Sequence, residues 1–142
     1  MARPRTVEAN LLRLRPREYT DIDLSFVPNP LTGDIGKLTN FNAVKNSIKN
    51  IIMTATAEKF FLPEFGSRVT GILFEQMDGI TLNTLKEEIK FAIRAFEPRV
   101  NLAEVLTRYS EEENTVDISI RFSLKNDPGR IINFEFVLER IR

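Results

Sequence analysis

Apolar residues recur every three or four positions in two stretches of the chain, which predicts two amphipathic helices, over about 40–53 and 81–96. Thr39 or Asn40 is expected to cap the first helix and Thr81 the second, because such side chains accept a free N–H of the first turn. Each helix has one stripe to bury. The stripes are Phe41, Val44, Ile48, Ile51 and Ile52 in the first helix, and Leu82, Leu85, Ile89, Ala92, Ile93 and Phe96 in the second.

From Val100 onward the apolar residues alternate with polar ones, as in strands with one buried face. Residues 100–109 form a first strand with weak alternation, 115–124 a strictly alternating second strand, and 132–138 a third. Polar turns separate them at 111–114 and 126–129. The pattern predicts an α+β fold, an antiparallel three- to four-stranded meander packed against the two main helices, whose outer edges stay open unless another segment covers them. The expected inward residues of the second strand are Val116, Ile118, Ile120, Phe122 and Leu124.

Between the helices, residues 57–67 predict a short strand or extended run that Pro63 and Gly66 interrupt. Residues 68–77 predict a short helix that ends in a turn at Asp78-Gly79. This short helix is expected to present Val69, Ile72, Leu73 and Phe74.

The first part of the chain has a different composition. Residues 1–36 predict an extended, basic N-terminal arm and leader, and residues 37–142 a single domain. Repeated prolines discourage long regular structure in the arm. Its arginines, Arg3, Arg5, Arg13, Arg15 and Arg17, can bind nucleic acid phosphates, but such arms more often wrap around a protein partner, and no groove-reading motif accompanies them.

Composition excludes several kinds of chemistry. The 20 basic and 20 acidic side chains balance, so net charge predicts no affinity for nucleic acid or membrane. The sequence has no cysteine and no histidine, which excludes disulfides and removes the commonest general base and metal ligand. No apolar run approaches the roughly 20 residues of a membrane helix, and no secretory signal is expected. We therefore expect no cofactor, no metal and no small-molecule substrate.

The remaining catalytic hypothesis is a pair of carboxylates, such as Glu64 or Glu75 together with Glu97 or Asp78. A glycosidase needs two carboxyl groups across a sugar cleft, one of them with a raised pKa. Sequence spacing does not establish such a pair, and a chain with 20 acidic residues contains candidate pairs by chance. No catalytic residue is assigned.

The end of the second helix carries a charged corner, Glu97-Pro98-Arg99. Proline disfavours the helical conformation in the residue before it, so the helix should stop near Phe96. A carboxylate at a helix C-terminus is disfavoured by about 0.3–1 kcal/mol. Glu97 therefore needs a compensating contact, which is either a local ion pair with Arg99 or a docking partner.

Three motifs carry a family resemblance: FFLPEFGS at 60–67, LFE at 73–75 and FEPRV at 96–100. Together with the alternating strands that follow, they resemble the baseplate wedge proteins of contractile-tailed phages. That family is also described as lysozyme-like and is shared with bacterial contractile injection machines. The resemblance covers residues 40–142, and residues 19–35 are similar to the leader of homologues in large phages.

The resemblance implies a structural protein of the virion tail baseplate, assembled in the host cytoplasm, in multiple copies around a six-fold ring. In the family, the residues matching Glu97, Pro98 and Arg99 grip a helical core bundle of other wedge proteins. The sheet is similar to the interlocking domain of the sheath subunit and would accept extended arms of the first sheath ring, initiating sheath assembly. The central tube or hub is a further candidate partner, and a peptidoglycan-degrading, lysozyme-like hydrolase is the alternative function. The expected strand-addition edge comprises Ile131, Asn133, Glu135, Val137 and Glu139.

Overall fold

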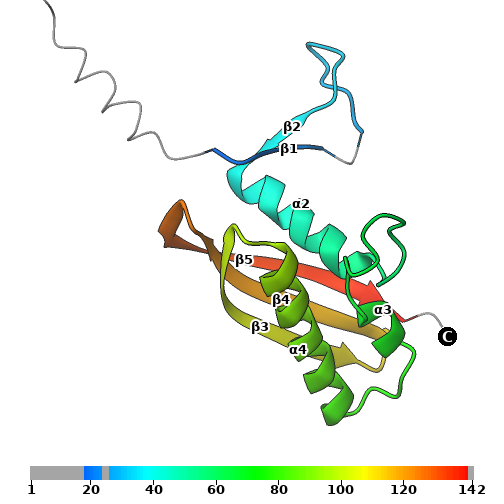
Figure 1. Ribbon diagram of the computed structural model, residues 1–142. Helices are drawn as coiled ribbons and strands as arrows, with labels where there is room; N and C mark the ends of the chain where they lie inside the picture. The colour runs from blue at the N-terminus through cyan, green and yellow to red at the C-terminus, as the bar shows by residue number, and fades with distance from the viewer. Residues whose placement is uncertain (1–17, 24–25, 141–142) are drawn as a thin grey trace, which may run out of the picture.

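The computed structural model describes residues 18–23 and 26–140, which form two layers and a separate ribbon (Figure 1). The elements are β1 Thr20–Ile22, β2 Lys37–Thr39, α2 Asn40–Met53, α3 Val69–Ile72, α4 Gly79–Phe96, β3 Val100–Ser110, β4 Thr115–Leu124 and β5 Asp127–Glu139. Strands β3-β4-β5 form an antiparallel sheet, and β1-β2 a two-stranded ribbon before α2. Helices α2 and α4 cover one face of the larger sheet. The predicted α+β fold is confirmed.

The central strand β4 determines which face of the sheet is buried. Its inward residues Ile118, Ile120 and Phe122 are at most 1% exposed, as the alternation predicts. In the neighbouring strand, Phe134 is paired with Ile120 and Phe136 with Ile118. These two phenylalanines remain half-buried because β5 is paired on one side only among the described strands.

Both long helices bury the stripe that their periodicity predicts. Only the residues in the terminal turns, Phe41, Leu82 and Phe96, stay half-buried. Burying each large apolar side chain contributes about 1.5–3 kcal/mol before conformational entropy is subtracted. No helix within residues 18–23 and 26–140 has the length and hydropathy of a membrane span. The buried core residues of these two helices are Val44, Ile48 and Ile52 from α2, and Leu85, Ile89 and Ile93 from α4.

The start of α4 differs from the prediction. The helix begins at Gly79, and the side chain of Asp78 accepts a hydrogen bond from the N–H of Thr81 at 2.7 Å. Thr81 is therefore the third residue of the helix and not its cap. Both side chains are good caps, but only Asp78 is placed to satisfy a free N–H one turn ahead. The pKa of Asp78 is lowered by this hydrogen bond from Thr81.

The segment between α2 and α3 also differs from the prediction. Residues 57–66 form a series of turns, and a single parallel bridge joins Ala55 to Ser67. Pro63 has no N–H to pair, and Ala57 has a left-handed φ of 72°, so an extended run cannot form. The predicted short helix is present as α3, but Phe74 lies beyond it and is 63% exposed.

Gly66 and Ser67 attach this segment to the C-terminal end of α2. Ser67, 1% exposed, donates its hydroxyl to the Ile52 carbonyl at 2.8 Å and its N–H to the Thr54 carbonyl at 2.9 Å. These bonds satisfy carbonyls that the end of a helix leaves without partners. Gly66 has a φ of 114°, and a Cβ at this position would lie 2.5 Å from the Thr54 carbonyl oxygen. The close approach therefore requires glycine.

We expect Gly66→Ala to lower the free energy of unfolding by about 2 kcal/mol or more, because the backbone conformation is strained for alanine and the new methyl group overlaps a backbone atom. Urea denaturation measures the change. Gly71→Ala is the matched control, since a Cβ added there would meet nothing within 4 Å and α3 tolerates alanine. Equal stability of the Gly66 variant and the wild type would show that the close approach is not a constraint.

Candidate partner-docking site

The elbow, defined as Glu97-Pro98-Arg99, connects α4 to β3. The helix ends at Phe96, as predicted, and the N–H of Glu97 still donates to the Ile93 carbonyl at 2.9 Å. Arg99 folds back onto the carboxylate: its Nε donates to Oε1 of Glu97 and its Nη2 to Oε2, both at 2.7 Å. The local ion pair considered from the sequence is therefore present, in a bidentate geometry that is strong and directional.

The Glu97 carboxylate is buried, with 2% of the side chain exposed. Burial alone raises the pKa of this carboxyl group. The hydrogen bonds from Arg99 and from the Ser47 hydroxyl, together with the positive charge of Arg99, outweigh burial and hold the pKa below its ordinary value. Ser47 belongs to α2, so one carboxylate connects α2, α4 and the start of β3.

Arg99 lies between the chain's interior and its surface, with 27% of its side chain exposed. Its guanidinium carbon lies 5.5 Å from the centroid of the Tyr19 ring, a cation–π distance, and the charge of Asp21 also stabilises it. The hydrogen bonds that Arg99 donates to Glu97 are the main reason that the pKa of Arg99 is raised. Nε and Nη2 are both used, whereas Nη1 has no hydrogen-bond partner within residues 18–23 and 26–140.

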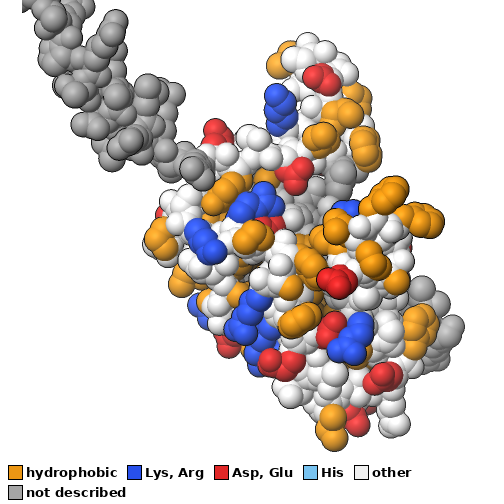
Figure 2. All heavy atoms as spheres, viewed as in Figure 1, with side chains coloured by type: hydrophobic (Ala, Val, Ile, Leu, Met, Phe, Trp, Pro, Cys, Tyr) orange, Lys and Arg blue, Asp and Glu red, His pale blue; other side chains and the backbone are white. Residues whose placement is uncertain are grey.

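A further cation lies next to the elbow, and two others contact rings on α2 and β5. The N–H of Lys125 donates to the Arg99 carbonyl at 3.0 Å, which places this lysine beside the elbow. The guanidinium of Arg130, on β5, lies 4.6 Å from the ring centroid of Phe41 in the first turn of α2. Lys45, also on α2, lies over the ring of Phe134 on β5. Figure 2 shows basic, acidic and apolar side chains interspersed over the face formed by α2 and α4.

Sequence reasoning did not identify Tyr19 or Ser47 as parts of the elbow. Ser47 lies among lysines and asparagines on the polar side of its helix, where no periodic signal distinguishes it. Tyr19 is held to α2 by its N–H, which donates to Asn40 Oδ1 at 3.2 Å. Both contacts join residues far apart in the chain, so only the folded structure reveals them.

The predicted strand-addition edge lies on β5. In the described chain this strand is the last of the sheet, and its neighbour on one side is β4. Pairing with β4 runs without interruption from Ile131 to Glu139. The five predicted residues alternate along this strand and are all exposed: Ile131, Asn133, Glu135, Val137 and Glu139.

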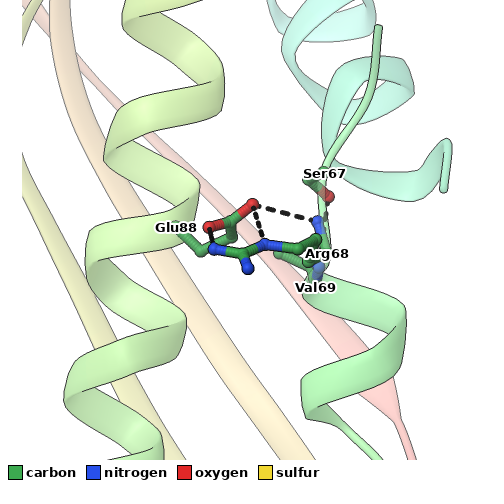
Figure 3. A network of polar contacts seen from close by, with 4 residues as sticks. All are labelled: Ser67, Arg68, Val69 and Glu88. Carbon is green, nitrogen blue, oxygen red and sulfur yellow. Dashed lines mark hydrogen bonds and ion pairs between the residues drawn. The ribbon is translucent and has the colours of Figure 1, made fainter. Parts of the chain in front are cut away.

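A second polar network supports the segment that follows Ser67 (Figure 3). Glu88 on α4 accepts hydrogen bonds from the N–H of Arg68 at 3.1 Å and from its Nη2 at 3.1 Å. Burial raises the pKa of Glu88, but these bonds from Arg68 outweigh it and the pKa is lowered. Val69 follows directly and is buried, so the pair fixes where α3 meets α4.

The backbone of the LFE motif accepts hydrogen bonds from Arg140, which directly follows strand β5. Nε of Arg140 donates to the Leu73 carbonyl and Nη2 to the Glu75 carbonyl, both at 2.8 Å. Nη1 contacts the Tyr109 hydroxyl at 3.2 Å, and the backbone of Arg140 is paired with Asn114. The motif therefore attaches the end of β5 to the turn after α3.

The structure does not favour the catalytic hypothesis. A general acid needs a raised pKa, but the pKa values of Glu97 and Asp78 are both lowered. Glu75 lines a shallow groove with Arg68 and Thr84 and without a second carboxylate among the lining residues. Glu64 is an exposed residue of the turns before Gly66. In the part of the chain that the structure describes, no three acidic side chains are grouped to hold a metal ion.

We expect Glu97→Gln to lower the free energy of unfolding by about 2 kcal/mol near neutral pH, because it removes charge-assisted bonds from a buried site. The folded-state pKa of Glu97 is depressed. Its contribution is therefore complete above the unfolded-state pKa of about 4.3 and disappears as the pH falls through the folded-state value. Urea denaturation at several pH values should show the difference between wild type and variant shrinking below about pH 4.3.

Glu87→Gln is the matched control. Glu87 also pairs with a cation, Lys90 at 2.7 Å, and this bond also lowers its pKa, but 59% of its side chain is exposed. Because an exposed pair contributes little, this variant should hardly change the stability. A loss in the Glu97 variant that stayed constant down to acidic pH would exclude the carboxylate charge as its cause.

Comparison with known proteins gives the chain a family. The family model of the baseplate wedge protein gp25 matches residues 40–129. Baseplate wedge protein gp25 of Enterobacteria phage T4 is 32% identical over 113 residues, which are 80% of this chain and 85% of the phage protein. The expectation of a structural and not an enzymatic protein agrees with these names.

Solved structures share the fold. A protein of Geobacter sulfurreducens, named as a candidate tail lysozyme, matches with a TM-score of 0.65 at 25% identity, over 70% of this chain and 89% of its own. A chain of the anti-feeding prophage baseplate matches with a TM-score of 0.60 at 18% identity, over 88% of both chains. The second likeness shows the fold alone. The sequence match and the family model together show that the chain belongs to the gp25 family of baseplate wedge proteins.

Proposed function

We propose that this chain is a structural component of the inner baseplate of a contractile tail. It docks onto the helical core bundle of other wedge proteins through the elbow, and it offers strand β5 to extended arms of the first sheath ring. In this role it initiates sheath assembly, in several copies around a six-fold ring of the virion. Family membership supports the baseplate role. The docking proposal rests on Arg99, which Glu97 holds rigidly while Nη1 keeps no hydrogen bond among the described residues.

The geometry of the elbow favours an acidic helix as its partner. A guanidinium binds carboxylates in fixed directions, and Arg99 is already ordered by the buried carboxylate of Glu97. Binding therefore costs little further side-chain entropy. The surrounding cations Lys45, Lys125 and Arg130 attract a negatively charged surface from a distance.

The test needs a variant that folds. Arg99→Ala alone would leave the Glu97 carboxylate buried without its ion-pair partner, which is strongly destabilising, so a loss of assembly would not distinguish misfolding from lost docking. The double variant Glu97→Gln/Arg99→Gln removes both charges and keeps two polar side chains that can hydrogen-bond to each other. It is the sharper variant for the docking role.

We expect Glu97→Gln/Arg99→Gln to fold but to reach purified baseplates at about a tenth of the wild-type level or less, because an interfacial arginine of this kind contributes about 1.4 kcal/mol or more. Quantitative mass spectrometry of baseplates measures the occupancy, and thermal unfolding of the isolated chain verifies the fold. Glu87→Gln/Lys90→Gln removes an ion pair from the middle of α4 and is the matched control. Wild-type occupancy of the elbow variant would refute docking through the elbow.

The two edges of the sheet differ in their suitability for strand addition. The pairing of β3 with β4 is irregular between Leu102 and Glu104, a feature that disturbs an edge and discourages a new strand. The pairing of β5 is regular from Ile131 to Glu139, and its proline, Pro128, lies near the start of the strand. An added strand needs a regular row of backbone groups and few side-chain contacts. These features support β5 as the acceptor of the sheath arm.

The absence of cysteine from the sequence allows a cross-linking test with one engineered thiol. We expect Glu135→Cys on β5, carrying a thiol-attached photocrosslinker, to capture the sheath subunit in isolated tails, because an added strand would lie within reach of this side chain. Ala103→Cys on β3 is the control, since this position is also exposed on an edge strand. Tandem mass spectrometry identifies the captured protein. Capture of sheath from position 103 alone, or from neither position, would contradict the assignment.

For the basic N-terminal arm, residues 1–36, we propose further partners. Arg3, Arg5, Arg13, Arg15 and Arg17 lie outside the described residues, and the division at residue 36 stays a prediction. We assign this arm to a neighbouring wedge protein or to the central tube or hub. The described part of the leader supports a role next to the elbow, since Tyr19 lies against Arg99.

A further inference from the structure

The loop after α2 carries three consecutive large apolar residues, Phe60, Phe61 and Leu62, which we call the FFL tip. Their side chains are 97%, 96% and 55% exposed. Figure 2 shows apolar side chains gathered on this loop. Two adjacent phenylalanines that contact almost nothing in their own chain contribute nothing to its core. In interfaces, such aromatic side chains supply much of the binding energy.

The loop that carries the FFL tip is ordered by its own hydrogen bonds. The N–H of Ala57 donates to the Pro63 carbonyl at 2.9 Å, which closes the loop at its base. Within it, the N–H of Leu62 donates to the Lys59 carbonyl at 3.2 Å, and the N–H of Phe65 to the Leu62 carbonyl at 3.0 Å. The exposed rings are therefore presented by a fixed backbone, which lowers the entropy lost on binding.

The base of the loop rests on the helix that ends at the elbow. The ring of Phe65 packs against that of Phe96 with centroids 5.2 Å apart, and Lys59 Nζ lies 4.4 Å from the Phe65 ring centroid. Phe96 is the last residue of α4 and directly precedes Glu97. The FFL tip and the elbow thus share one support, the last turn of α4.

We propose that the FFL tip is an aromatic anchor that inserts into an apolar pocket between helices of the same baseplate subunit that the elbow binds. This proposal rests on the proposed function, because the elbow defines the partner. The elbow supplies directional polar contacts, and the tip supplies the apolar burial that a charged corner lacks. An interface of this composition has an apolar centre beside a charged border, as stable protein interfaces do.

Four grooves on residues 18–23 and 26–140 have charged as well as apolar linings. Each includes both a cation and a carboxylate, and is therefore less suited to two phenylalanine rings than a purely apolar pocket in another subunit. The flanking charges also disfavour an anionic membrane: the tip is bordered by one lysine, Lys59, and by two carboxylates, Glu58 and Glu64. A different protein subunit is therefore the partner that fits.

The test replaces the two rings in the full chain. We expect Phe60→Ser/Phe61→Ser to unfold at the wild-type temperature, because both side chains are almost fully exposed, and to lower occupancy in purified baseplates by about tenfold or more for each ring. Phe91→Ser is the matched control, since Phe91 is 67% exposed on α4 outside the loop and should leave occupancy unchanged. A photoreactive phenylalanine analogue at position 60 should capture the same baseplate subunit as one at position 98.

Each other outcome identifies which proposal fails. Wild-type occupancy of the tip variant would overturn the anchor, and so would capture of a second copy of this chain from position 60. Binding of the wild-type chain, but not the tip variant, to phosphatidylethanolamine–phosphatidylglycerol vesicles would assign the tip to a membrane and also overturn it. Loss of occupancy with the tip variant but not with the elbow variant would refute the elbow and retain the tip as a baseplate contact. The reverse pattern would refute the tip alone.

Discussion

Burial of the Glu97 carboxylate is the constraint on which the arrangement of the two layers depends. A charge without partners in such a site costs several kcal/mol, so the fold must bring Arg99 and Ser47 to it. Arg99 lies at the start of the sheet and Ser47 on the other covering helix. Satisfying one carboxylate therefore fixes how α4 turns into β3 and how far α2 lies from that corner. The apolar faces then meet in one arrangement, although hydrophobic burial by itself has little directional preference.

Two other short motifs of this chain, the FGS and LFE stretches, take part in hydrogen bonds to backbone carbonyls that lie near helix ends. Ser67 satisfies carbonyls at the end of α2, and Arg140 satisfies carbonyls after α3. Helix ends leave such carbonyls without partners, and each costs free energy when it is buried. Both stretches thus close the connections between elements whose apolar stripes already pack together. These bonds explain the serine of the FGS stretch, whose hydroxyl takes part, whereas the LFE stretch contributes only backbone carbonyls, which any residue supplies.

Periodicity predicted the helices and strands because the apolar repeat of each element is set by residues that are close together in the sequence. The strict alternation of β4 is the clearest case. Prediction was wrong where two local preferences competed: Asp78 and Thr81 both suit a helix cap, and only the geometry of the first turn selects Asp78. The run at Phe60-Phe61 suggested a strand, but its rings are exposed on a loop that Gly66 and the turns define. Tyr19 and Ser47 could not be assigned to the elbow, because their contacts join distant parts of the chain.

An ion pair that is already satisfied within the chain is well suited to docking, for an electrostatic reason. Glu97 and Arg99 together carry no net charge, so the pair itself attracts a distant partner weakly, and long-range attraction must come from Lys45, Lys125 and Arg130. In the docking that we propose, the pair acts only at contact, where the guanidinium has a fixed direction and Nη1 has no hydrogen bond among the described residues. In this proposal, different residues control the association rate and the contact geometry. Because salt screens the long-range attraction far more than the contact, the proposed docking would become slower at high ionic strength while its geometry would still be set by the elbow.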